Sequence, residues 1–246
     1  MSDRRNLDLT LPWLAEGTRR FIALTDRLTD EELAAASLLE GWTRAHVVAH
    51  VALNAEALGR LVHWAATGEE TPMYRDSAQR VADIENLHPR PATELRHRLK
   101  AESERLTASL AALSRDGWNS EVRTRQGRPI PALEIPWMRV REVWMHAVDL
   151  GRGMHCSAFP PRLATVLLGE VTQWLGAMDG CPSLALVATD SSDAFAMGVA
   201  GEEASRVRGS TAELLAWATG RSLGESLIAE TNTCHAVALP QLPPWL

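Results

Sequence analysis

The chain has 246 residues, which is enough for one large domain or two modest ones, and its 46% apolar content is ample for a buried core. Its formal net charge of −6 argues against nucleic acid or an anionic membrane as a general partner. We also expect no membrane span and no signal segment, because no apolar run is long enough and the first residues lead into no apolar core.

The three cysteines, Cys156, Cys181 and Cys234, are widely spaced and form no Cys-x2-Cys pair. This pattern favours a reducing cytoplasm over a disulfide framework or a thiolate zinc site.

In the first half of the chain, apolar residues recur at helical spacing and predict long amphipathic helices. The expected long helices are residues 9–28, 43–67, 93–114 and 133–151. The first is expected to start near Thr10, and Thr43 is a good N-cap for the second. Short helices at 30–36 and 77–86 and a turn-rich excursion or small hairpin at 118–129 lie between them. Four long helices with short breaks predict a four-helix bundle.

The composition shifts after residues 151–153, where a different alternation of elements begins. The expected elements are a helix at 160–178, strands at 184–189, 194–199 and 205–208, and a helix at 210–219. The overall class is therefore α+β. We expect an all-helical, metal-binding domain at residues 1–155 and a smaller α+β domain at residues 156–246.

Two pairs of metal-ligand residues stand out on the expected bundle helices. His46 and His50 are four residues apart, and so are Glu142 and His146. On an α-helix this spacing places both side chains of a pair on one face. Facing helices would bring imidazoles and a carboxylate together, and zinc accepts these ligands.

Each pair alone is weak evidence, because most such histidines are satisfied core or surface groups and Glu142 fits an ordinary helical ion pair. The apolar surroundings of Glu142 add weight, since a buried carboxylate needs a cation. Its apolar neighbours are Val140, Val143, Trp144, Ala147 and Val148. From local pattern alone, a metal site and a bundle without metal both remain open.

Four segments of the chain carry a family resemblance: SLLEGWTRAHVVAHVA at 37–52, HWAATGEETPMY at 63–74, WMRVREVWMHAVDLG at 137–151 and PPWL at 243–246. These segments resemble the mycothiol-dependent maleylpyruvate isomerases, a family of DinB-like metalloenzymes. The resemblance covers nearly the whole chain, is dense in the bundle and is thin between residues 155 and 210. It implies a DinB-like four-helix bundle followed by the smaller domain.

The resemblance implies His50, Glu142 and His146 as the metal ligands and makes His46 a neighbour of the ion. It also implies two catalytic arginines, Arg221 and Arg80, which would hold the carboxylates or enolate of the substrate. The cofactors implied are zinc, or another divalent metal, and mycothiol.

Asp149 follows His146 by one turn of the same helix. It could orient a ligand or move protons, and it could equally be a polar residue at a helix end. No cysteine falls within the metal motifs, which fits an external thiol.

The reaction implied is the cis–trans isomerisation of maleylpyruvate to fumarylpyruvate in gentisate catabolism. The expected partners are mycothiol and a small dicarboxylate substrate, with no nucleic acid and no membrane, and the expected protein is a cytoplasmic monomer.

Other functions remain open on the sequence. A mycothiol S-transferase would keep the metal site without needing both arginines. A non-catalytic metal sensor or regulatory partner would more typically carry reactive cysteines beside the metal.

Overall fold

The computed structural model describes residues 3–198, 205–233 and 235–245. The chain divides into two compact units, Met1–Arg152 and Gly153–Leu246, and each is described by itself. Among the described residues, no helix is both long enough and apolar enough to cross a membrane.

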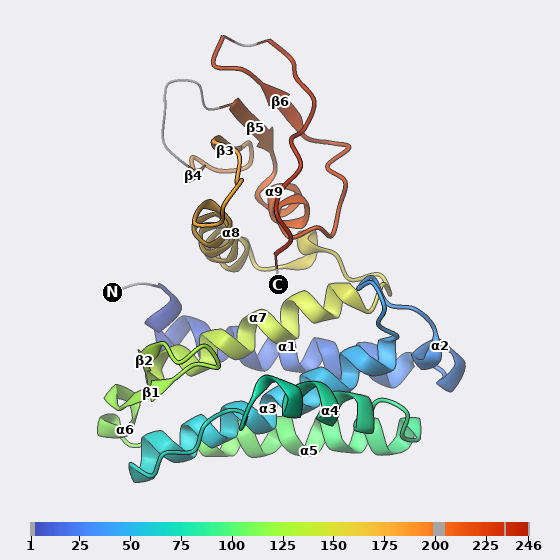
Figure 1. Ribbon diagram of the computed structural model, residues 1–246, viewed down its shortest axis with the longest axis vertical. Coiled ribbons are helices and arrows are strands. Elements are labelled where there is room, and N and C mark those ends of the chain that lie inside the picture. The colour runs from blue at the N-terminus through green and yellow to red at the C-terminus, as the bar shows by residue number, and fades with distance from the viewer. Residues whose placement is uncertain (1–2, 199–204, 234, 246) are drawn as a thin grey trace. The chain divides into compact units, whose positions relative to one another are not determined.

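The first unit is a four-helix bundle, as expected from the helical periodicity (Figure 1). Its long helices are α1 (Leu7–Arg27), α3 (Arg44–Thr67), α5 (Ala92–Ala111) and α7 (Ile135–Asp149). Helices α1 and α3 each pack against both α5 and α7, so the apolar stripes of all four meet in one core. Helix α3 has the largest number of buried residues of the four, and Val47, Val51 and Leu58 are fully shielded.

The first helix begins earlier than the sequence pattern predicts. We expected its start near Thr10, but the Asn6 side chain accepts a hydrogen bond from the backbone N–H of Asp8 and caps the helix there. Thr10 instead donates its hydroxyl to the Asn6 carbonyl inside the first turn, 3.1 Å away. Asparagine is a strong N-cap, so it outweighs the start signal of Thr10 with Pro12.

The start of α3 lies where Thr43 predicts it, and it is tied to the end of α7. Thr43 and His46 form a reciprocal capping box, in which each side chain accepts from the backbone N–H of the other residue. Arg44 donates to the Leu150 carbonyl at 2.6 Å. The early turns of α3 are therefore held beside the last turns of α7.

Short elements connect the long helices. They are η1 (Asp3–Arg5), α2 (Asp30–Ala34), α4 (Ser77–Leu87), α6 (Arg115–Asn119), β1 (Glu121–Arg123), β2 (Pro129–Pro131) and η2 (Ala132–Glu134). Strands β1 and β2 form the small antiparallel hairpin that the turn-rich segment allowed. Helix α6 was not predicted, and it is capped by Ser114, which accepts from Gly117 N–H.

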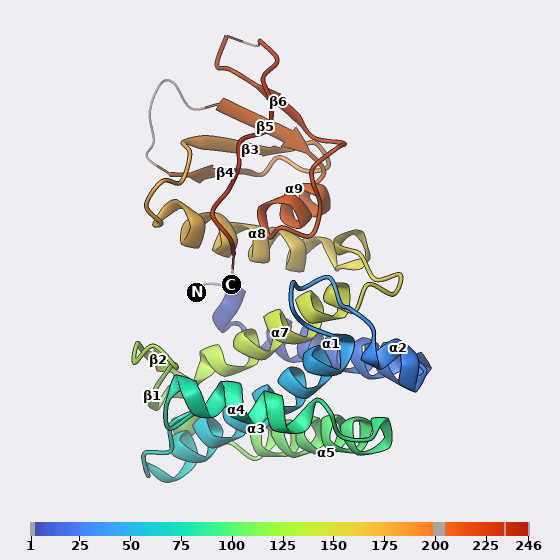
Figure 2. The ribbon, with the colours of Figure 1, turned by 45° about the vertical axis from the view of Figure 1, so that its right-hand side comes forward.

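The second unit is a small α+β domain, with a four-stranded sheet and two α-helices among its described residues. It contains η3 (Cys156–Ala158), α8 (Pro161–Gly176), β3 (Leu184–Ala188), β4 (Ala194–Met197), β5 (Ser205–Gly209), α9 (Thr211–Ala218) and β6 (Ile228–Glu230). The strand order is β4-β3-β5-β6, with β3 and β5 parallel and the other pairs antiparallel. Helices α8 and α9 pack together on one side of this sheet (Figure 2).

Two details of the second unit differ from expectation. Strand β4 ends at Met197, whereas the predicted strand ran to residue 199, which lies outside the described residues. Strand β6 was not predicted, because it is three residues long and its Ile228 is largely exposed, so it carries no alternating pattern.

Candidate metal centre

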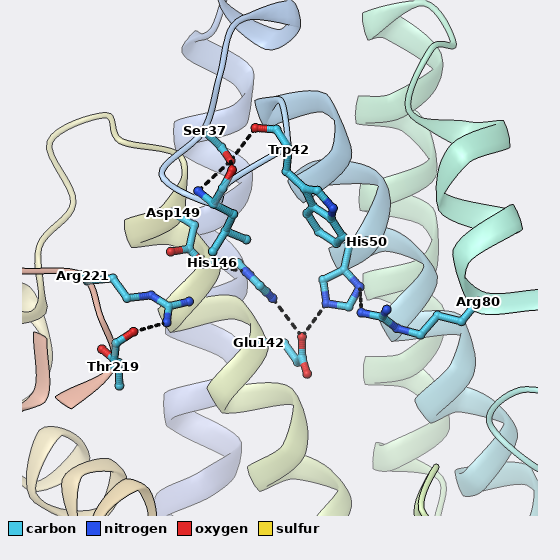
Figure 3. A network of polar contacts seen from close by, with 10 residues as sticks. Ser37, Trp42, His50, Arg80, Glu142, His146, Asp149, Thr219 and Arg221 are labelled. Carbon is cyan, nitrogen blue, oxygen red and sulfur yellow. Dashed lines mark hydrogen bonds and ion pairs between the residues drawn. The ribbon is translucent and has the colours of Figure 1, made fainter. Parts of the chain in front are cut away.

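Three potential metal ligands converge between α3 and α7 (Figure 3). The Glu142 Oε2 atom lies 2.8 Å from His50 Nε2 and 3.3 Å from His146 Nε2. The two imidazole rings are nearly perpendicular, at 86°, with their centroids 4.8 Å apart. The spacing of Glu142 and His146 along α7 and the packing of α3, which carries His50, on α7 thus produce a group of two nitrogens and a carboxylate.

Asp149 supports this group from the last turn of α7. Its side chain is completely buried, and its Oδ2 lies 2.8 Å from His146 Nδ1. A carboxylate at Nδ1 holds the proton on that nitrogen, which leaves Nε2 with a lone pair for an ion. Of the two sequence-based interpretations of Asp149, the geometry favours the orienting one.

The charges in the group are strongly coupled. Burial would raise the pKa of Glu142, but its contacts with His146 and His50 outweigh burial and hold it well below the usual range. Burial would lower the pKa of His146, but Asp149 and Glu142 outweigh it and raise this pKa to about 9. Burial lowers the pKa of His50 to about 4, against the opposing effect of Glu142. At neutral pH without an ion, His146 therefore carries the additional proton and is charged, whereas His50 is neutral.

Arg80, on α4, reaches the same group. Its Nη2 atom lies 3.3 Å from His50 Nδ1 (Figure 3). Arg80 is half-buried, and α4 packs against α3, so the guanidinium stands at the edge of the histidine–glutamate group. The structure therefore places this sequence-predicted residue beside the three candidate ligands.

Tyr74 also belongs to this region, although the sequence gave no reason to single it out. Burial raises the pKa of its phenol, and the Arg80 guanidinium, which hydrogen-bonds to it, opposes that rise. Tyr74 lies in the loop before α4, where spacing along a helix cannot indicate its direction.

Trp42, in the loop before α3, packs against the histidine rings at one side of the group. Its ring lies 5.7 Å from the His50 ring and 6.0 Å from the His46 ring, centroid to centroid. Ser37 holds the loop by donating its hydroxyl to the Trp42 carbonyl at 2.8 Å. A large apolar ring here limits the access of water to His50.

His46 lies apart from the three ligands and joins a second group with Glu85 and His88. The His46 and His88 rings stack with centroids 3.5 Å apart and planes 18° apart. Nearly parallel rings do not aim their lone pairs at one point, and His46 Nδ1 already accepts from Thr43. This second group therefore fits a contact between α3 and α4 better than an ion site.

Arg221 lies in the second unit, just after α9. Its Nη1 donates to the Thr219 carbonyl at 2.5 Å, and its guanidinium lies 5.3 Å from the centre of the Trp245 ring. Among the described residues Cys156 and Cys181 form no disulfide, and Cys234 lies outside the described residues.

The donor set fits a divalent ion. Two imidazole nitrogens and one carboxylate oxygen within 4.8 Å of one another are the ligands of a three-coordinate protein site with an open position. The buried carboxylate on His146 is the usual outer partner of a metal-bound histidine.

Comparisons with known proteins identify the family to which the whole chain is similar. The profile of the mycothiol maleylpyruvate isomerase N-terminal domain matches residues 14–151. The crystal structure of a mycothiol-dependent maleylpyruvate isomerase is similar over 100% of both chains, with 35% identity and a TM-score of 0.90. The crystal structure of a histidine-to-alanine mutant of such an isomerase also matches over 100% of both chains, with 34% identity and a TM-score of 0.90. No curated protein matches the chain.

Proposed function

The chain belongs to the mycothiol-dependent maleylpyruvate isomerase family, and from this premise we propose that it converts maleylpyruvate into fumarylpyruvate with mycothiol as the thiol. The observation that carries the proposal is the convergence of His50, Glu142 and His146 in a chain that matches such an isomerase along its whole length.

We propose that His50 Nε2, His146 Nε2 and the Glu142 carboxylate hold one divalent ion, with zinc as the expected metal. A bound ion of this kind stabilises a thiolate at neutral pH. Asp149 keeps the proton of His146 on Nδ1, and Trp42 covers the His50 side of the site.

The reaction needs a thiol because a carbon–carbon double bond does not rotate. The thiolate adds to one alkene carbon, and the electron pair of the double bond moves onto the neighbouring carbonyl as an enolate. Rotation about the new single bond follows. The enolate then re-forms the double bond in the trans geometry, the carbon–sulfur bond breaks, and the thiolate leaves unchanged.

Arg80 is placed to serve the anionic groups of the substrate. In the metal-free arrangement it donates toward His50 Nδ1. When His50 binds an ion through Nε2, its Nδ1 carries the proton and cannot accept a hydrogen bond. Arg80 then needs another acceptor, and a substrate carboxylate or enolate provides one. Tyr74, hydrogen-bonded to Arg80, helps to position the guanidinium.

We further propose that Arg221 holds a second carboxylate, since a planar guanidinium can bind one with two hydrogen bonds. The cysteine pattern supports an external thiol in a reducing cytoplasm. We keep a monomer and a place in gentisate catabolism as parts of the same proposal.

The deciding experiment is a maleylpyruvate assay on metal-loaded protein with and without mycothiol. We expect fumarylpyruvate to form only with the thiol. Rapid consumption of an electrophilic toxin with mycothiol, but no turnover of maleylpyruvate, would favour the S-transferase alternative.

A further inference from the structure

Arg139 is a buried arginine that the proposed mechanism does not use. It lies on α7, three residues before Glu142, and only 1% of it is exposed. Its Nη1 donates to the Val51 carbonyl at 2.7 Å and to Asn54 Oδ1 at 2.9 Å, and its Nη2 donates to Ser103 Oγ at 3.3 Å. The guanidinium thus joins α7 to α3 and α5.

All three acceptors are neutral. Among the residues that the structure describes, no carboxylate forms an ion pair with Arg139 within 4.0 Å. Burial lowers the pKa of Arg139 to about 10, and the nearby Glu142 and Tyr74 oppose this, so the side chain stays charged at neutral pH. A buried cation without a direct counterion is costly, and the anionic carboxylate that acts on it is a proposed metal ligand.

We propose that Arg139, whose guanidinium is bonded to α3 close in sequence to His50 and lies on α7 three residues before Glu142, is a fixed positive charge near the proposed metal centre that favours the binding of anions at the open coordination position. The inference rests on the proposed function, because it assumes that Glu142 is a metal ligand and that the thiol binds as a thiolate.

The charge balance of the site explains why such a cation is useful. Glu142, Asp149 and a thiolate together carry one negative charge more than a divalent ion supplies. Arg80 at the edge of the group offsets this one charge, but the substrate brings two further carboxylates to the site of a chain that is itself negative. Arg139 cancels this excess from within the bundle, where little solvent screens it.

A purely structural role of Arg139 and an electrostatic role predict different results for metal and anion binding. If Arg139 only holds α3, α5 and α7 together, its loss loosens the ligands and weakens the binding of both metal and anion. If its charge matters, its loss weakens anion binding but leaves metal binding unchanged or tighter, because a cation repels a divalent ion.

The test uses the full chain loaded with Co²⁺, whose visible spectrum reports both metal and ligand binding. The probes are Co²⁺ itself, in competition with a chelator, and azide as a simple anion. For Arg139→Met, we expect azide to bind about ten-fold more weakly, with Co²⁺ affinity equal to or higher than that of the wild type.

A second variant tests the charge without removing the arginine. Asn54→Asp is isosteric, and it places a carboxylate at the atom that now accepts from Arg139 Nη1. It should reproduce the loss of azide affinity while the fold is kept. Arg139→Lys and Asn54→Ala keep the charge and alter the hydrogen bonds, so both should bind azide nearly as the wild type does.

The proposal is overturned if Asn54→Asp weakens the binding of Co²⁺ and of azide equally. It is also overturned if azide affinity is unchanged in Asn54→Asp or in folded Arg139→Met. If Arg139→Met does not fold, Asn54→Asp decides alone. A wild-type protein that binds no Co²⁺ contradicts the metal centre and this inference with it. The expected azide pattern in a protein without maleylpyruvate turnover contradicts the proposed function and leaves this inference standing.

Discussion

The two units differ in the polar groups that they bury. Among the described residues of the first unit, five ionisable side chains from this group are buried: His46, His50, Glu102, Arg139 and Asp149. Among the described residues of the second unit, the buried polar side chains are Thr172, Thr211 and Thr219. A buried charge costs far more free energy than a buried hydroxyl unless it is paired. The bundle therefore buries charged groups at a cost in folding free energy, and a contribution to stability alone does not explain why they are there.

The partners of these groups also differ, although Thr211 on α9 donates to Asp190 Oδ1 in the turn after β3. Thr219 donates to the Leu215 carbonyl within its own helix at 2.7 Å, so no second element is needed. His50 on α3, by contrast, meets Glu142 on α7, and Arg139 reaches both α3 and α5. Buried polar groups that join separate helices mark the part of the molecule where position matters for chemistry, and the predictions below test that contrast.

The largest effect should come from removing a metal ligand. In His50→Ala, two ligands remain and cannot hold the ion, so we expect loss of both bound metal and turnover. Metal analysis and the maleylpyruvate assay measure this. His63→Ala, an exposed histidine on the same helix, is the matched control and should retain both. Full metal occupancy in His50→Ala would show that the ligands are assigned wrongly.

A smaller loss should follow from Arg221→Ala, which asks whether the second unit has a catalytic role at all. Loss of one charge-assisted contact should cost roughly 2–4 kcal/mol, on the order of 30- to 1000-fold in kcat/KM. Metal content should not change, and Arg221→Lys should recover little because lysine cannot bind a carboxylate with two hydrogen bonds.

The exposed Arg206 on β5 offers a control in the same unit, and Arg206→Ala should behave as wild type. Near-normal turnover of Arg221→Ala at low substrate would leave the second unit with a structural role only.

Next in size is a pH effect on metal binding. Without an ion, His146 holds its proton up to a pKa of about 9, and the ion must displace that proton. Affinity should therefore rise about ten-fold per pH unit from pH 7 toward pH 9 and then level off. Titration with Zn²⁺ in a chelator buffer measures this.

Asp149→Asn removes the carboxylate that raises the pKa of His146, so the levelling should occur at a lower pH. A flat profile from pH 7 to pH 9 in the wild type would mean that His146 is already deprotonated or is not a ligand.

The smallest effect is expected from the cysteines. Cys156→Ala, Cys181→Ala and Cys234→Ala should each keep full turnover with added mycothiol, because the nucleophilic sulfur is external. Cys156 is buried, so its replacement should lower the melting temperature slightly. Loss of turnover in any one folded variant would indicate an internal nucleophile.

Local patterns predicted the bundle and the two pairs of ligand-type residues because their signals are local, whereas the family resemblance singled out His50, Glu142 and His146 as the proposed ligands. Thr43 caps α3 by its own side chain, and the spacing of Glu142 and His146 fixes their common face on any α-helix. What local patterns missed depends on distant partners. The role of Asp149 requires its contact with His146, and the placement of His46 requires α4, which carries Glu85 and ends at its C-cap His88.

The short strand β6 and helix α6 were missed for another reason. Elements of three to five residues complete too little of a period for apolar spacing to indicate them, and they form because neighbouring chain supplies their hydrogen bonds. Tyr74 was missed because a loop has no period that tells where a side chain points.

Changes in helix α4 would alter the substrate preference of this fold while its proposed metal-dependent chemistry stays the same. It is 11 residues long and packs chiefly on α3, yet it carries Arg80, while the candidate ligands all lie on α3 and α7. A new arginine position, or a different cap at Asp76, would redirect the proposed anion-binding guanidinium and leave the three candidate ligands in place. Within a family built on this bundle, α4 is therefore the segment where divergence in specificity should concentrate, because altering it carries the least risk to the metal centre.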